Sequence, residues 1–172
     1  MNKLKVLFVY LPSFSLEYIN EAIRNKEDLV TTLTMPLGIL YLSSFLKKNN
    51  DIDHVGLLDY CLPLKTVNQY ESVDDYVLNE INKQVDFIPD IIGISLVFSA
   101  SHTFFEKLMI YLKKLWNKSI IVLGGEHATN CTRFLLRNIS IDYYKRGRRK
   151  CIFGICSAIS KRTISKRSIV IY

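Results

Sequence analysis

Two glycines and two histidines are the residues whose types and positions first suggest chemistry. Gly124 and Gly125 end an apolar run and are followed directly by Glu126 and His127, while His102 follows another apolar run. A serine hydrolase would need a GxSxG turn or a serine held by a histidine, and no such turn precedes either histidine. Two interpretations of the glycines stay open. They form a plain turn from a strand into a helix, or the floor of a ligand site, because glycine lets a bulky group approach the backbone.

Other common chemistries lack their sequence motifs. Neither GxGxxG nor GxxxxGK[ST] occurs, so the chain carries no dinucleotide-binding or P-loop signature. A phosphoacceptor domain needs acids after its first strand, and the nearest acid here is Glu17. Ser13 and Ser15 match the phosphate loop of a flavodoxin only faintly. None of the four cysteines is spaced as CxxC, and we expect reduced thiols rather than metal ligands.

Alternating strand and helix patterns must position these residues. Continuous apolar runs predict strands at residues 5–10, 54–59, 91–96, 119–123 and 141–144. Helical patterns lie between them, at residues 36–48, 72–87, 101–116 and 129–138. Because the strands are continuously apolar, we expect an α/β fold in which helices cover both faces of a five-stranded parallel sheet.

Two details of this pattern carry further expectations. The stretch between Pro12 and Met35 is polar, and we expect it to be irregular. The first predicted helix carries an apolar stripe that we expect in the core, made of Leu37, Leu40, Tyr41 and Phe45.

Ligands of open parallel sheets bind outside the carboxyl ends of the strands. The candidate site therefore consists of the segments that follow the predicted strands: residues 10–13, 59–60, 95–99, 124–127 and 145–147. These segments are rich in hydroxyl groups and glycines and poor in acid–base pairs.

Six segments, in this order, carry a family resemblance: KVLFVYLPS, MPLGILYLSSFLKK, HVGLLDY, PDIIGISLVFSASH, IIVLGGEHAT and IDYYKRG. Over about residues 3–147 the chain resembles the N-terminal cobalamin-binding domain of radical S-adenosylmethionine enzymes. The most specific parts are MPLGILYLSSFLKK before a strand that ends in Asp59, and GGEHAT before a strand that ends in RG. The resemblance implies a flavodoxin-like, Rossmann-like fold and cobalamin as the cofactor.

The resemblance also implies a set of cofactor-binding residues. The loop at residues 95–99 and the glycine floor would flank the nucleotide tail of cobalamin, and the segments at residues 10–12 and 37–38 would lie near the corrin ring. The candidates are Tyr10, Leu11, Pro12, Leu37, Gly38, Ser95, Leu96, Val97, Phe98, Ser99, Gly124, Gly125, Glu126, His127, Arg146 and Gly147. Ser95 is the candidate that we favour as a ligand contact. His127 either faces the cofactor or simply begins the next helix.

Two departures from related families limit what the chain is expected to do. It has no DxHxxG, the motif whose histidine ligates cobalt in other cobalamin domains, so we assign no protein ligand to the metal. It also has no CxxxCxxC, so we expect no iron–sulfur cluster. The chain alone should therefore not be catalytic, and its partner would be a separate radical S-adenosylmethionine domain. The alternative is a flavodoxin-like remnant or interaction module that binds no cofactor.

Charge divides the chain near residue 147. The whole chain has 23 basic and 16 acidic residues. Residues 145–172 hold nine Lys or Arg and no acid, whereas residues 1–144 hold 14 basic and 16 acidic residues. We predict a domain over residues 1–147 and a basic tail over 148–172 that is poorly ordered or aberrant, as a truncation or frameshift would leave it. We interpret the tail as a solvated end rather than an arm for nucleic acid. No apolar run is long enough for a membrane span, and the N-terminus lacks a cleavage site, so we expect a cytoplasmic protein.

Overall fold

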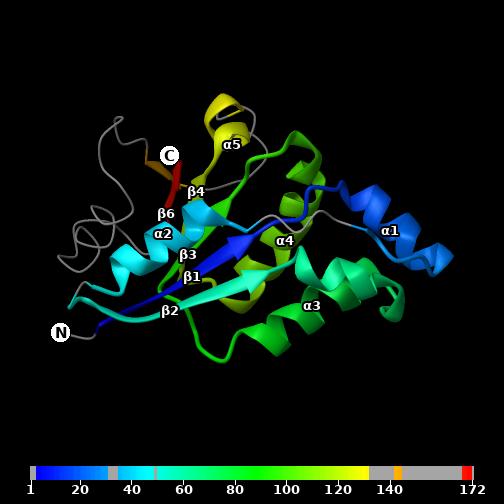
Figure 1. Ribbon diagram of the computed structural model, residues 1–172. Helices are drawn as coiled ribbons and strands as arrows, with labels where there is room; N and C mark the ends of the chain where they lie inside the picture. The colour runs from blue at the N-terminus through cyan, green and yellow to red at the C-terminus, as the bar shows by residue number, and fades with distance from the viewer. Residues whose placement is uncertain (1–2, 31–34, 49, 132–141, 145–167, 172) are drawn as a thin grey trace.

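A computed structural model describes residues 3–30, 35–48, 50–131, 142–144 and 168–171. Its centre is a parallel sheet with the strand order β2-β1-β3-β4-β6-β5 (Figure 1). The strands are β1 (Leu4–Tyr10), β2 (Ile52–Asp59), β3 (Ile91–Ser95), β4 (Ile120–Gly124), β5 (Asp142–Tyr144) and β6 (Ser168–Ile171). The expected α/β fold with a parallel sheet is confirmed.

The strand count differs from the expectation of five, because β6 comes from the segment interpreted as a basic tail. It pairs with β4 on one side and with β5 on the other. Its core, Ile169-Val170-Ile171, is β-branched and suits a pleated sheet. The basic residues before it dominate the composition of residues 145–172, so the sequence predicts a tail and does not predict a strand in this short apolar run. The rest of the tail lies outside the described residues, and the boundary at residue 147 stays a prediction.

The helices are α1 (Leu16–Asn25), α2 (Leu37–Leu46), α3 (Val73–Gln84), α4 (His102–Leu115) and α5 (Glu126–Asn130), with two 3₁₀ segments, η1 (Leu62–Gln69) and η2 (Ser99–Ser101). The stretch expected to be irregular contains α1, so that expectation is wrong. The side chain of Ser15 accepts a hydrogen bond from the Tyr18 amide and caps the helix. Ile19, Ala22 and Ile23 are buried on one side, and the polar majority on the other side masked this narrow stripe.

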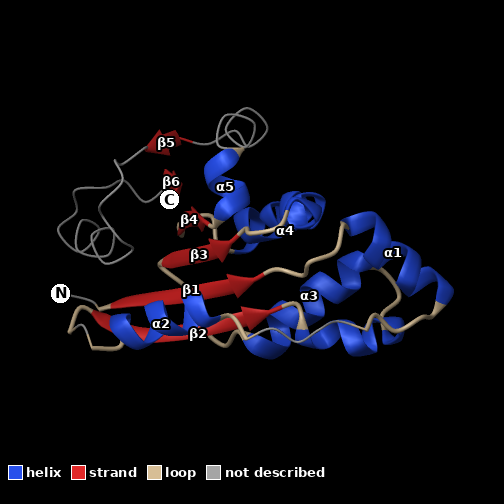
Figure 2. Ribbon diagram, turned by 45° about the horizontal axis from the view of Figure 1, so that its top comes forward, coloured by secondary structure: helices blue, strands red, loops and turns tan. Residues whose placement is uncertain are grey.

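Successive strand residues face opposite sides of the sheet and build two separate cores. Leu7, Val9 and Ile94 pack on one side with the buried residues of α1, α3 and α4. Val6, Phe8, Ile91, Ile120 and Val122 pack on the other side with α2. Figure 2 shows α2 in front of the sheet, with α1, α3 and α4 behind it. Helices therefore cover both faces, as the continuous apolar strands predict.

Helix α2 turns a different side to the sheet from the one expected. Its buried residues are Ile39 and Leu46, whereas the four residues of the predicted core stripe are exposed, from 41% at Leu40 to 75% at Tyr41. The sequence LGILYLSSFL is apolar around almost the whole helix, so periodicity alone could not select the buried side. No helix within the described residues is long and apolar enough to cross a membrane.

Candidate functional site

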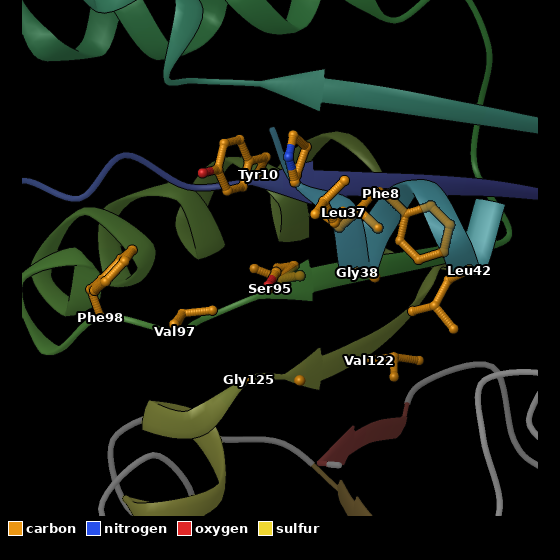
Figure 3. Close-up of a pocket in the computed structure, with 15 residues that line it drawn as sticks. Phe8, Tyr10, Leu37, Gly38, Leu42, Ser95, Val97, Phe98, Val122 and Gly125 are labelled. Carbon is orange, nitrogen blue, oxygen red and sulfur yellow. The ribbon is translucent and has the colours of Figure 1, made fainter. Parts of the chain in front are cut away.

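A pocket of about 540 Å³ opens at the carboxyl ends of three neighbouring strands, next to the start of α2 (Figure 3). Its walls come from β1, α2, β3 with the loop that follows it, and β4 with its terminal turn. The lining residues are Phe8, Tyr10, Pro36, Leu37, Gly38, Ile39, Leu42, Gly93, Ile94, Ser95, Val97, Phe98, Val122, Gly124 and Gly125. The pocket therefore lies where an open parallel sheet binds its ligands.

Eight of the sixteen candidate residues line this pocket: Tyr10, Leu37, Gly38, Ser95, Val97, Phe98, Gly124 and Gly125. The sheet register explains why they meet, because Tyr10 of β1 pairs with Ser95 of β3, and Ser95 pairs with Gly124 of β4. These three residues form one row across the sheet at its carboxyl edge. The sequence missed Phe8, Gly93 and Val122, which lie earlier in the same strands and face the side covered by α2.

Three other candidates are buried outside the pocket. Leu11 and Leu96 belong to the core on the opposite side of the sheet. Pro12 is buried, and its carbonyl oxygen accepts a hydrogen bond of 2.6 Å from the Ser101 hydroxyl. The Leu11 carbonyl oxygen likewise accepts one of 3.2 Å from the Cys61 thiol. These residues fix the loops that bring their neighbours to the pocket.

Three further candidates are described but do not line the pocket. Glu126 is exposed at the first position of α5, as expected of a helix-start residue. Ser99 and His127 contact each other, with 3.1 Å between Ser99 Oγ and His127 Nδ1. Arg146 and Gly147 lie outside the described residues.

The two glycines of β4 and its turn have different structural roles. Gly125 has φ 105° and ψ 167°, a conformation nearly restricted to glycine, and a Cβ there would lie 2.5 Å from the Leu96 carbonyl oxygen. A Cβ at Gly124 or Gly38 would meet nothing within 4 Å. Gly125 is therefore required by the turn, whereas Gly124 leaves open space beside the pocket. The interpretation as a turn is met at Gly125, and the interpretation as a ligand floor stays a prediction, for which Gly124 has the space.

The histidine of the GGEHAT segment belongs to a polar group that the sequence did not reveal. His127 Nε2 lies 3.2 Å from His102 Nδ1, and His102 Nε2 lies 3.3 Å from Glu106 Oε1. Burial, and then the charge of His102, hold the pKa of His127 below its usual value. The sequence showed only that each histidine follows a predicted strand, and the pairing of β3 with β4 in the folded protein brings the two together.

The side chains that line the pocket are mainly apolar. The described lining is mainly aliphatic and aromatic, with the hydroxyl groups of Tyr10 and Ser95 as polar side-chain groups, and no charged residue is among these described residues. Among the described residues no group of three His, Cys, Asp or Glu is placed to hold a metal ion. Cys61, close to the site, is buried, and burial together with the charge of Asp59 raises the pKa of its thiol to about 12. An apolar ligand group oriented by a few hydrogen bonds fits such a cavity.

Comparison with known proteins supplies the family. The model of the B12 binding domain matches residues 28–151, which include most of the pocket lining. The chain is also 27% identical over 164 residues to a protein of Pyrococcus horikoshii named "Uncharacterized methyltransferase PH0819". That match covers 94% of this chain but only 30% of the Pyrococcus protein. No solved structure matches the chain significantly. The chain belongs to the B12-binding domain family.

Proposed function

We propose that the chain binds cobalamin in the pocket between α2 and the carboxyl ends of β1, β3 and β4. Membership of the B12-binding family supports the identity of the ligand. The observation that carries the proposal is the pocket itself, an apolar cavity at the expected edge of the sheet with open space beside Gly38 and Gly124. A cofactor with a flat, bulky body needs such places where no Cβ blocks its approach.

The residues of the pocket suggest which part of cobalamin each would hold. A volume of about 540 Å³ suits a drug-sized group rather than the whole cofactor, so the nucleotide tail is the part that enters. Phe8 and Val122 would form the apolar floor, and the hydroxyl groups of Ser95 and Tyr10 would orient the tail by hydrogen bonds. Leu37, which is 69% exposed, would contact the corrin ring at the mouth of the pocket.

We propose further that the chain serves a larger catalytic assembly and is not catalytic alone. When bound, cobalamin supplies a cobalt centre that can carry a methyl group, and the Pyrococcus relative is named a methyltransferase. The chain spans 30% of that relative, so the catalytic part would lie elsewhere, in a separate domain of the radical S-adenosylmethionine type. The mainly apolar side chains that line the pocket support a role in holding the cofactor.

Gel filtration after incubation with hydroxocobalamin tests the proposal. We expect the corrinoid spectrum to travel with the protein peak. We also expect the melting temperature to rise with ligand concentration, because a ligand that binds only the native state stabilises it. A colourless protein peak together with an unchanged melting temperature would favour the alternative, a remnant or interaction module that binds no cofactor.

A further inference from the structure

Four polar side chains from three segments form a continuous row beside the pocket. Ser99 of η2 contacts His127 of α5, which contacts His102 of α4, which in turn faces Glu106 one helical turn further on. The separations are 3.1, 3.2 and 3.3 Å. Residues 97–98, which precede Ser99, and Gly125, which precedes α5, line the pocket, and Figure 3 shows Val97, Phe98 and Gly125 in adjoining parts of it.

One set of proton positions satisfies the contact between the two histidines and the contact with Ser99 when both rings are neutral. His102 carries its proton on Nε2, facing the Glu106 carboxylate, so that its Nδ1 accepts from His127 Nε2–H. The Nδ1 atom of His127 is then an acceptor for the Ser99 hydroxyl. A neutral imidazole has one donor and one acceptor nitrogen, and His127 uses both in this arrangement.

The short helix α5 depends on such contacts for its position. It has five residues, too few for a helix to be stable by itself. The Ala128 amide also donates to the Leu96 carbonyl oxygen, at 3.3 Å. The histidine pair adds side-chain links from α5 to η2 and to α4. It therefore helps to hold the turn at Gly125 against the loop that carries Phe98.

We propose that His102 and His127 are positioning residues that hold the rim of the cofactor pocket together while neutral and release it when both are protonated. This inference rests on the proposed function only for its effect on cobalamin. With one added proton the rings still share a hydrogen bond. With two, His127 Nε2–H and His102 Nδ1–H face each other across a distance of 3.2 Å, and the bond is replaced by repulsion.

The surroundings of the pair fix the direction of the pH effect. The titratable groups that the described residues bring to it are Glu106 of α4, beside His102, and Cys131 at the end of α5, whose Sγ lies 3.6 Å from His127 Nδ1. A positive charge on His102 opposes a proton on His127. Burial and the charge of His102 lower the pKa of His127 from its usual value of 6.5, so the link is still intact at that pH and is lost only as the pH falls through the lowered pKa.

The test compares cobalamin affinity at about pH 7.5 and about pH 5.5 in the wild-type chain, the His127→Gln variant and the His54→Gln variant. In the wild type we expect the affinity for cobalamin to fall about threefold to tenfold at the lower pH, because the hydrogen bond between His127 and His102 is lost. His127→Gln should remove most of this pH dependence. His54→Gln should retain it, because His54 packs on Phe87 and belongs to β2, away from the pair. Equal pH dependence in all three proteins would overturn the proposal.

A second readout needs no cofactor. In NMR titrations of the histidine ring protons, His102→Gln should raise the pKa of His127, because the charge that opposes its protonation is gone. Titration of His127 that is unchanged by His102→Gln would also overturn the proposal. If cobalamin binds at no pH, the proposed function fails, and this titration still decides whether the two histidines are coupled.

Discussion

Replacement of each glycine at the end of β4 by alanine should affect stability very differently. Gly125→Ala places a Cβ 2.5 Å from the Leu96 carbonyl oxygen and requires a non-glycine residue to adopt φ 105°. Gly124→Ala adds the same methyl group one residue earlier, where it meets no atom within 4 Å and φ is not positive. The second variant is thus a matched control for the first.

The size of the effect follows from two contributions. A non-glycine residue in this backbone region costs about 1–3 kcal/mol. Movement of Leu96 away from the new methyl group would also weaken the 3.3 Å hydrogen bond from Ala128, a loss of about 1 kcal/mol. Together they lower the free energy of unfolding by about 2–4 kcal/mol, or the melting temperature by about 5–15 °C for a chain of this length. Gly124→Ala should change it by less than about 1 kcal/mol, through the unfolded chain alone.

Urea denaturation followed by circular dichroism measures both variants against the wild type. Equal midpoints for Gly124→Ala and Gly125→Ala, or a Gly125→Ala protein as stable as the wild type, would refute the assignment of the turn to Gly125. A Gly124→Ala protein as unstable as Gly125→Ala would refute the argument that Gly124 is open toward the pocket.

Three further predictions concern the site, the core and the sheet edge. Ser95→Ala should weaken cobalamin binding about twofold to tenfold, because one hydrogen bond to the ligand is lost, and should change the melting temperature little. An unchanged dissociation constant, measured by calorimetry, would exclude the Ser95 hydroxyl group as a ligand contact. Cys61 should resist iodoacetamide at about pH 8 in the native protein and react after unfolding, because it is buried and the pKa of its thiol is raised to about 12. Peptide mass spectrometry locates the label, and rapid native labelling would contradict the burial. Deletion of residues 168–172 removes β6 from between β4 and β5 and should lower the melting temperature in a thermal scan, whereas a free tail would leave it unchanged.

The parallel sheet was predictable because its four main strands are continuous apolar runs separated by helical patterns. The parts that failed have separate causes. Helix α1 carries local signals, an apolar stripe of Ile19, Ala22 and Ile23 and an N-cap at Ser15, but the many polar residues around them favoured an irregular stretch. Helix α2 is apolar all round, so its buried side is selected by contact with β1 and β2 in the folded protein. Tertiary packing decides such cases, and local periodicity does not.

The candidate site was predictable at its rim and not in its depth. The rule that ligands lie at the carboxyl ends of strands led to Tyr10, Ser95 and Gly124, which share one row of the sheet. It could not separate these from Leu11 and Leu96, whose side chains turn to the opposite core because strand residues alternate. The contact between His102 and His127 depends on the adjacency of β3 and β4, which no local pattern encodes.

The occupation of this pocket by cobalamin is the central claim, and equilibrium dialysis with a pocket-filling variant tests it most directly. Gly124→Leu extends a side chain into the open space at the pocket, and Asn130→Leu adds the same side chain at an exposed position of α5 outside the lining. We predict that the wild type and Asn130→Leu bind hydroxocobalamin with the same dissociation constant and that Gly124→Leu binds at least about tenfold more weakly. Equal affinity in all three proteins, or no binding by the wild type, would contradict the claim.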